Sequence, residues 1–259
     1  MVYLSIKLKL NIFYDMIPKI IHWCWLSGDP IPENLQRYMD SWKRLLPDYE
    51  FIHWDFKRFP RGKSEWVDQA FDTHKYAFAA DYIRLYALYN YGGFYLDMDV
   101  EVLKNFDELL DHHVMLGCDS DGFPEVAAFG AEKGNAWIGL CLDTYNQRSF
   151  IKKDGSYETE PLPAVIKRLT DSSQFYLKKV HGLDDYIEGE DEICILPSEY
   201  FGPKSYATGE IHTTNHTFLI HHFAGSWIPK YERLEKKIWL FLGLKPHCII
   251  GKVLNLFKR

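Results

Sequence analysis

The sequence is poor in cysteine and shows no pattern that would pair its cysteines. None of the five forms a CxxC pair or has the spacing of a zinc finger. An odd, scattered set of thiols is typical of a reducing compartment, so we expect buried, reduced cysteines in a cytoplasmic protein rather than a disulfide scaffold. The five positions are 24, 118, 141, 194 and 248.

The sequence also lacks a secretory leader pattern, a membrane span and an excess of positive charge. Residues 1–16 are interrupted by Lys7, Lys9 and Asn11, which does not fit a signal peptide, and no apolar run approaches the ~20 residues of a spanning helix. Thirty Lys and Arg against 36 Asp and Glu give a net charge of −6, which argues against nucleic acid as a partner. A chain of 259 residues, 47% of them hydrophobic, suits one sizeable globular domain.

What the chain does contain is a glycine pair followed by an apolar run that ends in two carboxylates. Residues 91–100 are Tyr-Gly-Gly-Phe-Tyr-Leu-Asp-Met-Asp-Val. In an extended strand, Asp97 and Asp99 would point the same way while Leu96 and Met98 face the core. Two carboxylates side by side repel each other, and a divalent cation relieves that repulsion. An isolated pair of this kind also fits a solvated strand end, so the neighbouring segments carry the argument.

A helix is predicted directly upstream, from Lys75 to Asn90. Its apolar residues recur at near-helical spacing, and the glycine pair lies just beyond its end. Asp81 and Arg84 are three residues apart and therefore lie on one face of that helix. They form either a simple intrahelical ion pair or, because the rest of the helix is apolar and aromatic, part of a cleft shared with Asp97 and Asp99.

In this order, the segments resemble glycosyltransferase family 32, a family of DXD-containing sugar transferases. Residues 80–84 (Ala-Asp-Tyr-Ile-Arg) precede the DXD segment 91–99, as in that family. The opening segment 17–25 resembles the family's first strand, and 220–227 (Ile-His-His-Phe-Ala-Gly-Ser-Trp) resembles its closing motif. The resemblance spans roughly residues 16 to 228. It implies a GT-A fold, a nucleotide-sugar donor bound with Mn²⁺ or Mg²⁺, and retention of the anomeric configuration.

We expect a single GT-A-like α/β domain over residues 1–229, with a Rossmann-like, mixed but mostly parallel sheet flanked by helices. The alternation of strand-like and helical patterns supports this fold class. Residues 152–192 are polar with little periodicity and are predicted to be a loop-rich insertion, after which 193–196 and 217–222 return to the sheet. The other predicted elements are strands 17–25, 49–54, 114–118 and 126–130, and helices 32–46, 64–71, 137–150 and 161–169.

Ligands of open α/β sheets bind beyond the carboxyl ends of the strands, where Trp25, Asp97, Asp99 and His222 are predicted to lie. By resemblance, Trp25 would stack on the base of a UDP- or GDP-sugar, with a core tryptophan as the alternative. Tyr95 would contact the ribose or the sugar, and packing is an equally good role for it.

The resemblance also implies the rest of the donor site. Asp81 and Arg84 would hold the hydroxyls of the donor sugar. Asp99 and His222 would bind the cation, with His222 preferred to His221 because it precedes a glycine by three residues. Asp97 would either reach the cation as well or bridge to the ribose of the nucleotide sugar through water. Mixed nitrogen and oxygen ligands favour Mn²⁺ over Mg²⁺. In the closing motif, the hydroxyl of Ser226 and the indole N–H of Trp227 would donate hydrogen bonds to the diphosphate.

The last thirty residues, 230–259, have their own character. Eight Lys and Arg against two Glu give this tail a charge of +6, and apolar residues from Ile249 to Phe257 fall on one helical face. Such a basic amphipathic helix either lies on an anionic membrane surface or packs back on the domain. The first alternative suits an enzyme peripheral to the inner face of a membrane that uses a lipid-linked saccharide acceptor.

The predicted function is that of a retaining, metal-dependent hexosyltransferase. It would move a hexose or N-acetylhexosamine to a saccharide acceptor in capsule, lipopolysaccharide or surface glycan synthesis. A haloacid-dehalogenase phosphohydrolase, with Asp97 as nucleophile, and a non-catalytic sugar-binding module are the alternatives. Asp119, Asp121 and Glu125, between two predicted strands, form either a solvated acidic turn or a contact with donor or acceptor hydroxyls.

Overall fold

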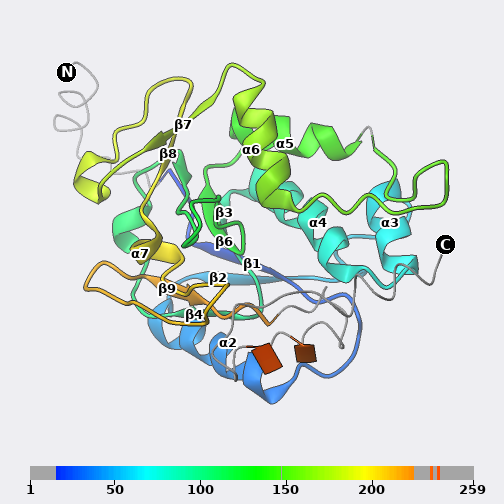
Figure 1. Cartoon of the computed structure of the whole chain (residues 1–259), viewed down its shortest axis with the longest axis horizontal. Helices are drawn as coiled ribbons and strands as arrows, with labels where there is room; N and C mark the ends of the chain where they lie inside the picture. The colour runs from blue at the N-terminus through cyan, green and yellow to red at the C-terminus, as the bar shows by residue number, and fades with distance from the viewer. Residues whose placement is uncertain (1–15, 147, 225–233, 236–237, 240–259) are drawn as a thin grey trace.

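A five-stranded sheet forms the centre of the protein (Figure 1). A computed structural model describes residues 16–146, 148–224, 234, 235, 238 and 239. The strand order is β2-β1-β3-β6-β5, in which β1 pairs in parallel with β2 and β3, and β6 is antiparallel to β3 and β5. Four of the five strands therefore run in one direction, which confirms the expected mixed, mostly parallel sheet. The strands are β1 (Ile20–Cys24), β2 (Glu50–Trp54), β3 (Gly93–Leu96), β5 (Val114–Met115) and β6 (Ala128–Ala131).

Two hydrophobic cores cover the two faces of this sheet. Because successive side chains of a strand alternate, Tyr95 of β3 packs into one core while Phe94 and Leu96 pack into the other. Helices α3 (Glu65–Asp72), α4 (Tyr76–Tyr91), α5 (Ala136–Asn146) and α6 (Leu162–Asp171) contribute to the first core, as Figure 1 shows above the sheet. The second core takes residues from α2 (Glu33–Leu45) and α7 (Ser198–Phe201). Helices thus flank both faces, as the fold class predicts.

The connection from α4 to β3 is as tight as the glycine pair suggests. Gly92 ends the helix with a φ of 70°, and its N–H donates to the Leu88 carbonyl. Gly93 has a φ of 103°, and a Cβ there would lie 2.6 Å from the Ile20 carbonyl oxygen. Only glycine tolerates both a positive φ and so close an approach of the neighbouring backbone. The glycine pair therefore lets β3 run directly against β1. The helix bearing Asp81 and Arg84 is thereby fixed relative to the end of β3.

Two short sheets lie beside the central one, and here the sequence prediction is wrong. Residues 217–222 do not return to the central sheet, and residues 193–196 reach its edge only through a parallel bridge, within the described residues, between Leu196 and Gly117 just beyond β5. Strand β8 (Glu192–Ile195) pairs with β7 (Tyr176–Lys179), which lies inside the segment expected to be loop-rich. Strand β9 (Leu219–His221) pairs antiparallel with β4 (Val100–Val102), directly after the DXD segment. The predicted insertion therefore holds α6, β7 and the 3₁₀ turn Leu183–Asp185.

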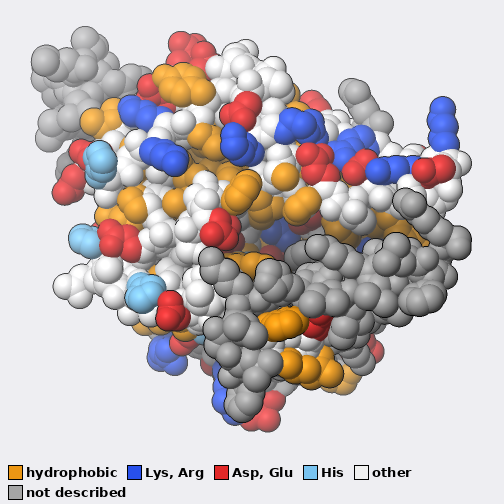
Figure 2. Space-filling model, in the orientation of Figure 1, with side chains coloured by type: hydrophobic (Ala, Val, Ile, Leu, Met, Phe, Trp, Pro, Cys, Tyr) orange, Lys and Arg blue, Asp and Glu red, His pale blue; other side chains and the backbone are white. Residues whose placement is uncertain are grey.

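Charged and hydrophobic side chains are mixed on one face of the protein (Figure 2). On the face shown in Figure 2, basic side chains lie among acidic ones, with hydrophobic side chains between them. Among the described residues, no helix combines the length and the apolar character needed to cross a bilayer. The predicted amphipathic helix of the tail 230–259 and the boundary at residue 229 fall almost wholly outside the described residues.

Candidate functional site

The two aspartates of the DXD segment lie in a tight turn between β3 and β4. Strand β3 ends at Leu96 and β4 begins at Val100, whose N–H donates to the Asp97 carbonyl over 3.0 Å. The expectation that Asp97 and Asp99 share a face through strand alternation is therefore wrong. The turn, and not a strand, brings the two carboxylates together, while Met98 between them is buried as predicted.

Arg84 of α4 links the helix to this turn. Its Nη2 lies 3.2 Å from Asp97 Oδ1 and 3.2 Å from Asp81 Oδ1, and its Nη1 donates to the Val126 carbonyl over 2.6 Å. The Tyr95 hydroxyl donates to the same Asp97 oxygen over 3.0 Å. Within the described residues, both side-chain hydrogen bonds to Asp97 thus reach Oδ1, which leaves Oδ2 for a ligand. Only 5% of the Arg84 side chain is exposed, so its guanidinium is held in place between Asp81 and Asp97 and fixes the position of both carboxylates.

Burial dominates the ionisation of the helix carboxylate. Removal from water raises the pKa of Asp81 to about 7, against an opposing effect of Arg84 that favours the charged form. Burial also raises the pKa of Asp97, and Arg84 again opposes it. The surroundings of Asp81 therefore disfavour its charged form. About 12% of its side chain is nevertheless exposed, and this part can contact a ligand hydroxyl.

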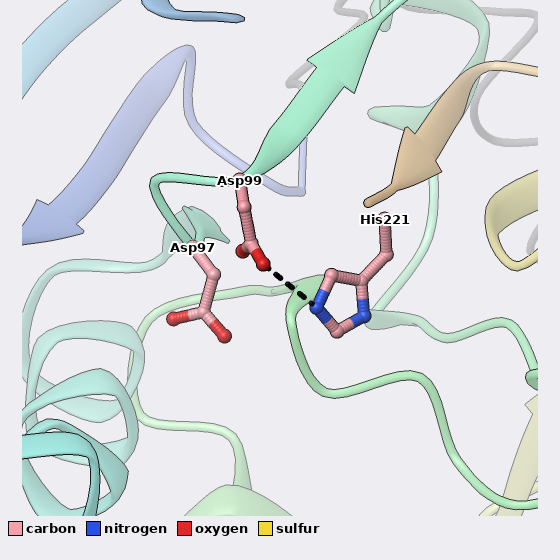
Figure 3. A group of neighbouring side chains, drawn as sticks. All are labelled: Asp97, Asp99 and His221. Atoms are coloured by element: carbon pink, nitrogen blue, oxygen red, sulfur yellow. Dashed lines mark ion pairs between the residues drawn. The ribbon is translucent and has the colours of Figure 1, made fainter. Parts of the chain in front are cut away.

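Asp99 and His221 form the second half of the site (Figure 3). His221 pairs with Val100 across the β4–β9 ladder, which places its Nε2 3.5 Å from Asp99 Oδ2. The Ala224 N–H donates to the same Asp99 oxygen over 2.6 Å. Burial opposes ionisation of Asp99, but these two partners outweigh it and hold the pKa of its carboxyl below the usual range. Asp99 is therefore a stable anion at neutral pH.

Asp97, Asp99 and His221 each offer one ligand atom, and these atoms all lie within 4.8 Å of one another. Figure 3 shows the three side chains converging from the turn and from the end of β9. Two carboxylate oxygens and one imidazole nitrogen are a donor set that a divalent cation of the Mn²⁺ type accepts. Because Asp97 and His221 remain partly exposed, the cluster is open to further ligands such as phosphate oxygens. The residues present fit a metal site.

The histidine of this cluster is His221, which corrects the expected His222. Adjacent residues of a strand point to opposite sides. The ring of His222 turns away and stacks on Tyr38, with centroids 4.4 Å apart, while its Nε2 lies 2.8 Å from Glu101 Oε2. His222 instead contributes its backbone N–H, which donates to the Asp99 carbonyl over 2.9 Å.

The remaining predicted donor-site residues fall into three groups. Trp25 follows the carboxyl end of β1 and is partly buried, with its indole N–H donating to the Asp29 carbonyl over 2.7 Å, so base stacking stays a prediction. Tyr95 is 1% exposed, which favours the packing alternative over a contact with ribose or sugar, and its hydroxyl orients Asp97. Ser226 and Trp227 lie outside the described residues.

Two further charged groups lie at this site, of which sequence reasoning missed one and gave the other a different role. Glu125, one of the three acids between β5 and β6, is buried and its Oε2 lies 3.2 Å from His221 Nδ1. Lys204 donates to the His222 carbonyl over 2.9 Å, and the pKa of Lys204 is lowered by burial despite the attraction of Asp99. Glu125 was expected in a solvated acidic turn or in contact with donor or acceptor hydroxyls, and its burial against His221 contradicts the first of these alternatives. Lys204 belongs to no motif, so the sequence carried no signal for it.

A family model described as a glycosyltransferase sugar-binding region containing the DXD motif matches residues 32–116. Inositol phosphoceramide mannosyltransferase 3 of Schizosaccharomyces pombe is 32% identical over 126 residues, which cover 47% of this chain and 35% of that protein. That match spans about a third of the relative's own length. Inositol phosphoceramide mannosyltransferase 1 of the same yeast is 32% identical over 271 residues, which cover 95% of this chain and 75% of that protein.

Solved structures of glycosyltransferases are also similar to this chain, at low scores. The structure titled PaToxG Glycosyltransferase has a TM-score of 0.44 and 19% identity, and the match covers 60% of this chain and 68% of that one. A glycosyltransferase involved in the glycosylation of the major capsid of PBCV-1 has a TM-score of 0.40 and 9% identity, over 81% of this chain and 96% of that one. The family assignment rests on the sequence relatives. The match of inositol phosphoceramide mannosyltransferase 1 along 95% of this chain, together with the family model over residues 32–116, shows that this protein belongs to the DXD-containing glycosyltransferases of the family 32 type.

Proposed function

We propose that this glycosyltransferase transfers a hexose from a nucleotide diphosphate sugar with the help of a divalent cation held by Asp97, Asp99 and His221. The observation that carries the proposal is the cluster of three ligand atoms within 4.8 Å at the DXD turn. A cation bound there supplies positive charge that stabilises the diphosphate as it leaves the sugar. Mn²⁺ is the proposed ion and Mg²⁺ the alternative, because one of the three ligands is an imidazole nitrogen.

The chain's own residues do the rest of the work. Arg84 and Tyr95 fix Asp97 through Oδ1, so its carboxylate is presented in one orientation. The backbone N–H of Ala224 fixes Asp99 by donating to Oδ2, the oxygen that faces His221. Asp81, with its raised pKa and partly open edge, is the group proposed to hold a donor-sugar hydroxyl. Fixed ligands of this kind reduce the reorganisation that the reaction requires.

The acceptor is proposed to be a hydroxyl of a polar lipid headgroup or of a lipid-linked saccharide, and the transferred sugar to be mannose. Three relatives carry the name inositol phosphoceramide mannosyltransferase, and one of them matches 95% of this chain. Those names favour a sphingolipid-type acceptor over the capsular or lipopolysaccharide acceptor expected from the sequence. UDP- and GDP-sugars are both retained as proposed donors.

Retention of the anomeric configuration remains a proposal from the family resemblance. In a front-side displacement, the acceptor hydroxyl attacks on the face from which the diphosphate leaves, and a departing phosphate oxygen accepts the hydroxyl proton. The new glycosidic bond forms as the sugar–phosphate bond breaks, so no second catalytic carboxylate is needed. Analysis of the product anomer by NMR tests this step.

Two other functions were considered from the sequence, and the geometry favours neither. A phosphohydrolase of the haloacid-dehalogenase type would use Asp97 as its nucleophile, whereas this chain belongs to the DXD-containing glycosyltransferases and its Asp97 lies in a cluster with Asp99 and His221. A non-catalytic sugar-binding module would need no cation cluster. Dependence of donor turnover on Mn²⁺ separates the proposed enzyme from the binding module.

The test is Mn²⁺-dependent hydrolysis of a panel of UDP- and GDP-linked hexoses, mannose included, by the full chain. The variant Asp99→Asn should lose turnover while it keeps the wild-type unfolding temperature. Asp121→Asn is the matched control, because Asp121 is an exposed acid on the neighbouring loop. Turnover that survives Asp99→Asn, or that proceeds equally with EDTA, would contradict the proposed function.

A further inference from the structure

Glu125 is a buried acid on the loop between β5 and β6. Its residue is 4% exposed, and its backbone N–H donates to the Gly117 carbonyl over 2.8 Å. Among the described residues, His221 is the group that pairs with its charge. Burying a carboxylate costs several kcal/mol unless its partners are well placed, so the contacts of this side chain need a physical explanation.

Both oxygens of the Glu125 carboxylate accept hydrogen bonds. Oε1 accepts the N–H of Ala127 over 3.0 Å, and Oε2 lies 3.2 Å from Nδ1 of His221. The Ala127 carbonyl in turn accepts the N–H of Asp97 over 2.7 Å. A single residue, Ala127, therefore ties Glu125 to the DXD turn, so the carboxylate and the aspartates keep a fixed spacing.

The imidazole of His221 lies between two carboxylates. Nδ1 faces Glu125 at 3.2 Å, and Nε2 faces Asp99 at 3.5 Å. A neutral imidazole carries one proton, and the ring nitrogen without it offers the lone pair that binds a cation. Which nitrogen keeps the proton is decided by the hydrogen bond on the other side of the ring.

We propose that Glu125 is a positioning residue, which accepts the Nδ1–H of His221 and thereby presents Nε2 to a divalent cation shared with Asp97 and Asp99. This inference rests on the proposed function, because it assigns a role at the same cation site. It goes beyond that function in naming the group that sets the proton position and the ring orientation of the histidine ligand. Neither the DXD motif nor the closing histidine pair includes Glu125.

Glu125→Gln would keep nearly the same side-chain shape, but the glutamine could not accept both of the hydrogen bonds that the carboxylate accepts. Its side chain has one acceptor oxygen and one NH₂ group, whereas the site asks for two acceptors, one for Ala127 N–H and one for His221 Nδ1–H. Facing the imidazole with NH₂ would force the proton onto Nε2. Facing Ala127 with NH₂ would place two donors together. Either arrangement weakens cation binding.

The test measures Mn²⁺ affinity directly, from the EPR signal of free Mn²⁺ in titrations of the full chain. Glu125→Gln should weaken binding by about 10- to 100-fold, the usual effect of losing such a partner of a metal ligand. Asp121→Asn removes the same charge from the same loop at an exposed site and should leave the affinity unchanged. Thermal unfolding of each variant reports whether the fold is kept.

A double-mutant cycle with His221→Ala separates positioning from a general effect on structure. If Glu125 acts through the imidazole, Glu125→Gln should cause no further loss of affinity once His221 is absent. Equal losses in both backgrounds, or wild-type affinity in Glu125→Gln while His221→Ala has lost binding, would overturn the inference and leave the proposed function standing. Wild-type affinity in His221→Ala would overturn the proposed metal site as well.

A second measurement needs no substitution at Glu125. With saturating Mg²⁺, two-bond ¹⁵N–¹H spectra of histidine-labelled protein report which ring nitrogen is protonated, and the His221 signals are identified by their loss in His221→Ala. We expect a protonated Nδ1 and an unprotonated Nε2. The opposite tautomer in the Mg²⁺-bound protein would refute the role of Glu125, even if Mg²⁺ binds with high affinity.

Discussion

Replacing Asp81 by asparagine should remove a pH-dependent cost of folding. Burial raises the pKa of Asp81 from 3.8 to about 7, so the folded protein resists ionisation of a group that ionises freely when unfolded. The difference is about three pKa units, and each unit corresponds to about 1.4 kcal/mol, which gives a penalty on the order of 4 kcal/mol once the group is fully charged.

The direction in which stability changes with pH follows from the raised pKa of Asp81. The stability contributed by Asp81 is fully present below its unfolded pKa near 3.8, and it is lost as the pH rises through about 7. Asparagine has no charge to bury at any pH. At pH 5, already about one unit above the unfolded pKa of 3.8, Asp81→Asn should be more stable than wild type by about 1.6 kcal/mol. At pH 8.5, above the folded pKa of about 7, the gain should reach about 4 kcal/mol.

Urea titrations of both proteins at pH 5 and pH 8.5, at equal ionic strength, measure this difference. Comparison of the two proteins at each pH cancels the titration of the other groups, which they share. Asp40→Asn removes a carboxylate from an exposed position on α2 and serves as the control, for which no pH-dependent gain is expected. The reasoning is refuted if the gain in Asp81→Asn is the same at both pH values.

Three further predictions concern the fold and the cation. Gly93→Ala should lower the free energy of unfolding by at least about 2 kcal/mol in urea titrations, because of its φ of 103° and the 2.6 Å approach to Ile20; Gly122→Ala, with φ of 83° and open space, should cost less. Trp42→Phe should cost about 1–3 kcal/mol, since the buried Val100 carbonyl loses its 2.7 Å indole donor. EDTA should abolish donor hydrolysis and excess Mn²⁺ should restore it; activity that persists in EDTA would exclude a required cation.

The sequence predicts long, strongly patterned elements well. Helix α4 was expected from Lys75 to Asn90 and spans Tyr76–Tyr91, because sixteen residues of helical spacing end at a glycine that can adopt positive φ. Strand β1 was placed within a few residues for a similar reason, as a continuous apolar run. Strands of three or four residues are different. Their partners are chosen by contacts with distant segments, so β9 joined β4 and not the central sheet.

At the candidate site too, the residues of one continuous segment could be predicted from the sequence, whereas the histidine, which depends on pairing between distant strands, could not. Asp81, Arg84, Asp97 and Asp99 were predicted to share one cleft, and the Arg84 contacts with Asp81 and Asp97 bring them together. The choice of histidine was wrong, because a shift of one residue in a strand reverses which side chain faces the site. Only the register between β4 and β9 decides that choice.

The pairing of β4 with β9 has a consequence for how the protein becomes active during synthesis. Val100 and His221 are partners in one ladder, although 121 residues separate them in the chain. A ribosome therefore completes the central sheet and the acidic turn well before it makes the imidazole that closes the cluster. A chain that ends before His221 therefore has both aspartates of the cluster but lacks its imidazole, and the proposed cation site would be incomplete until synthesis reaches β9.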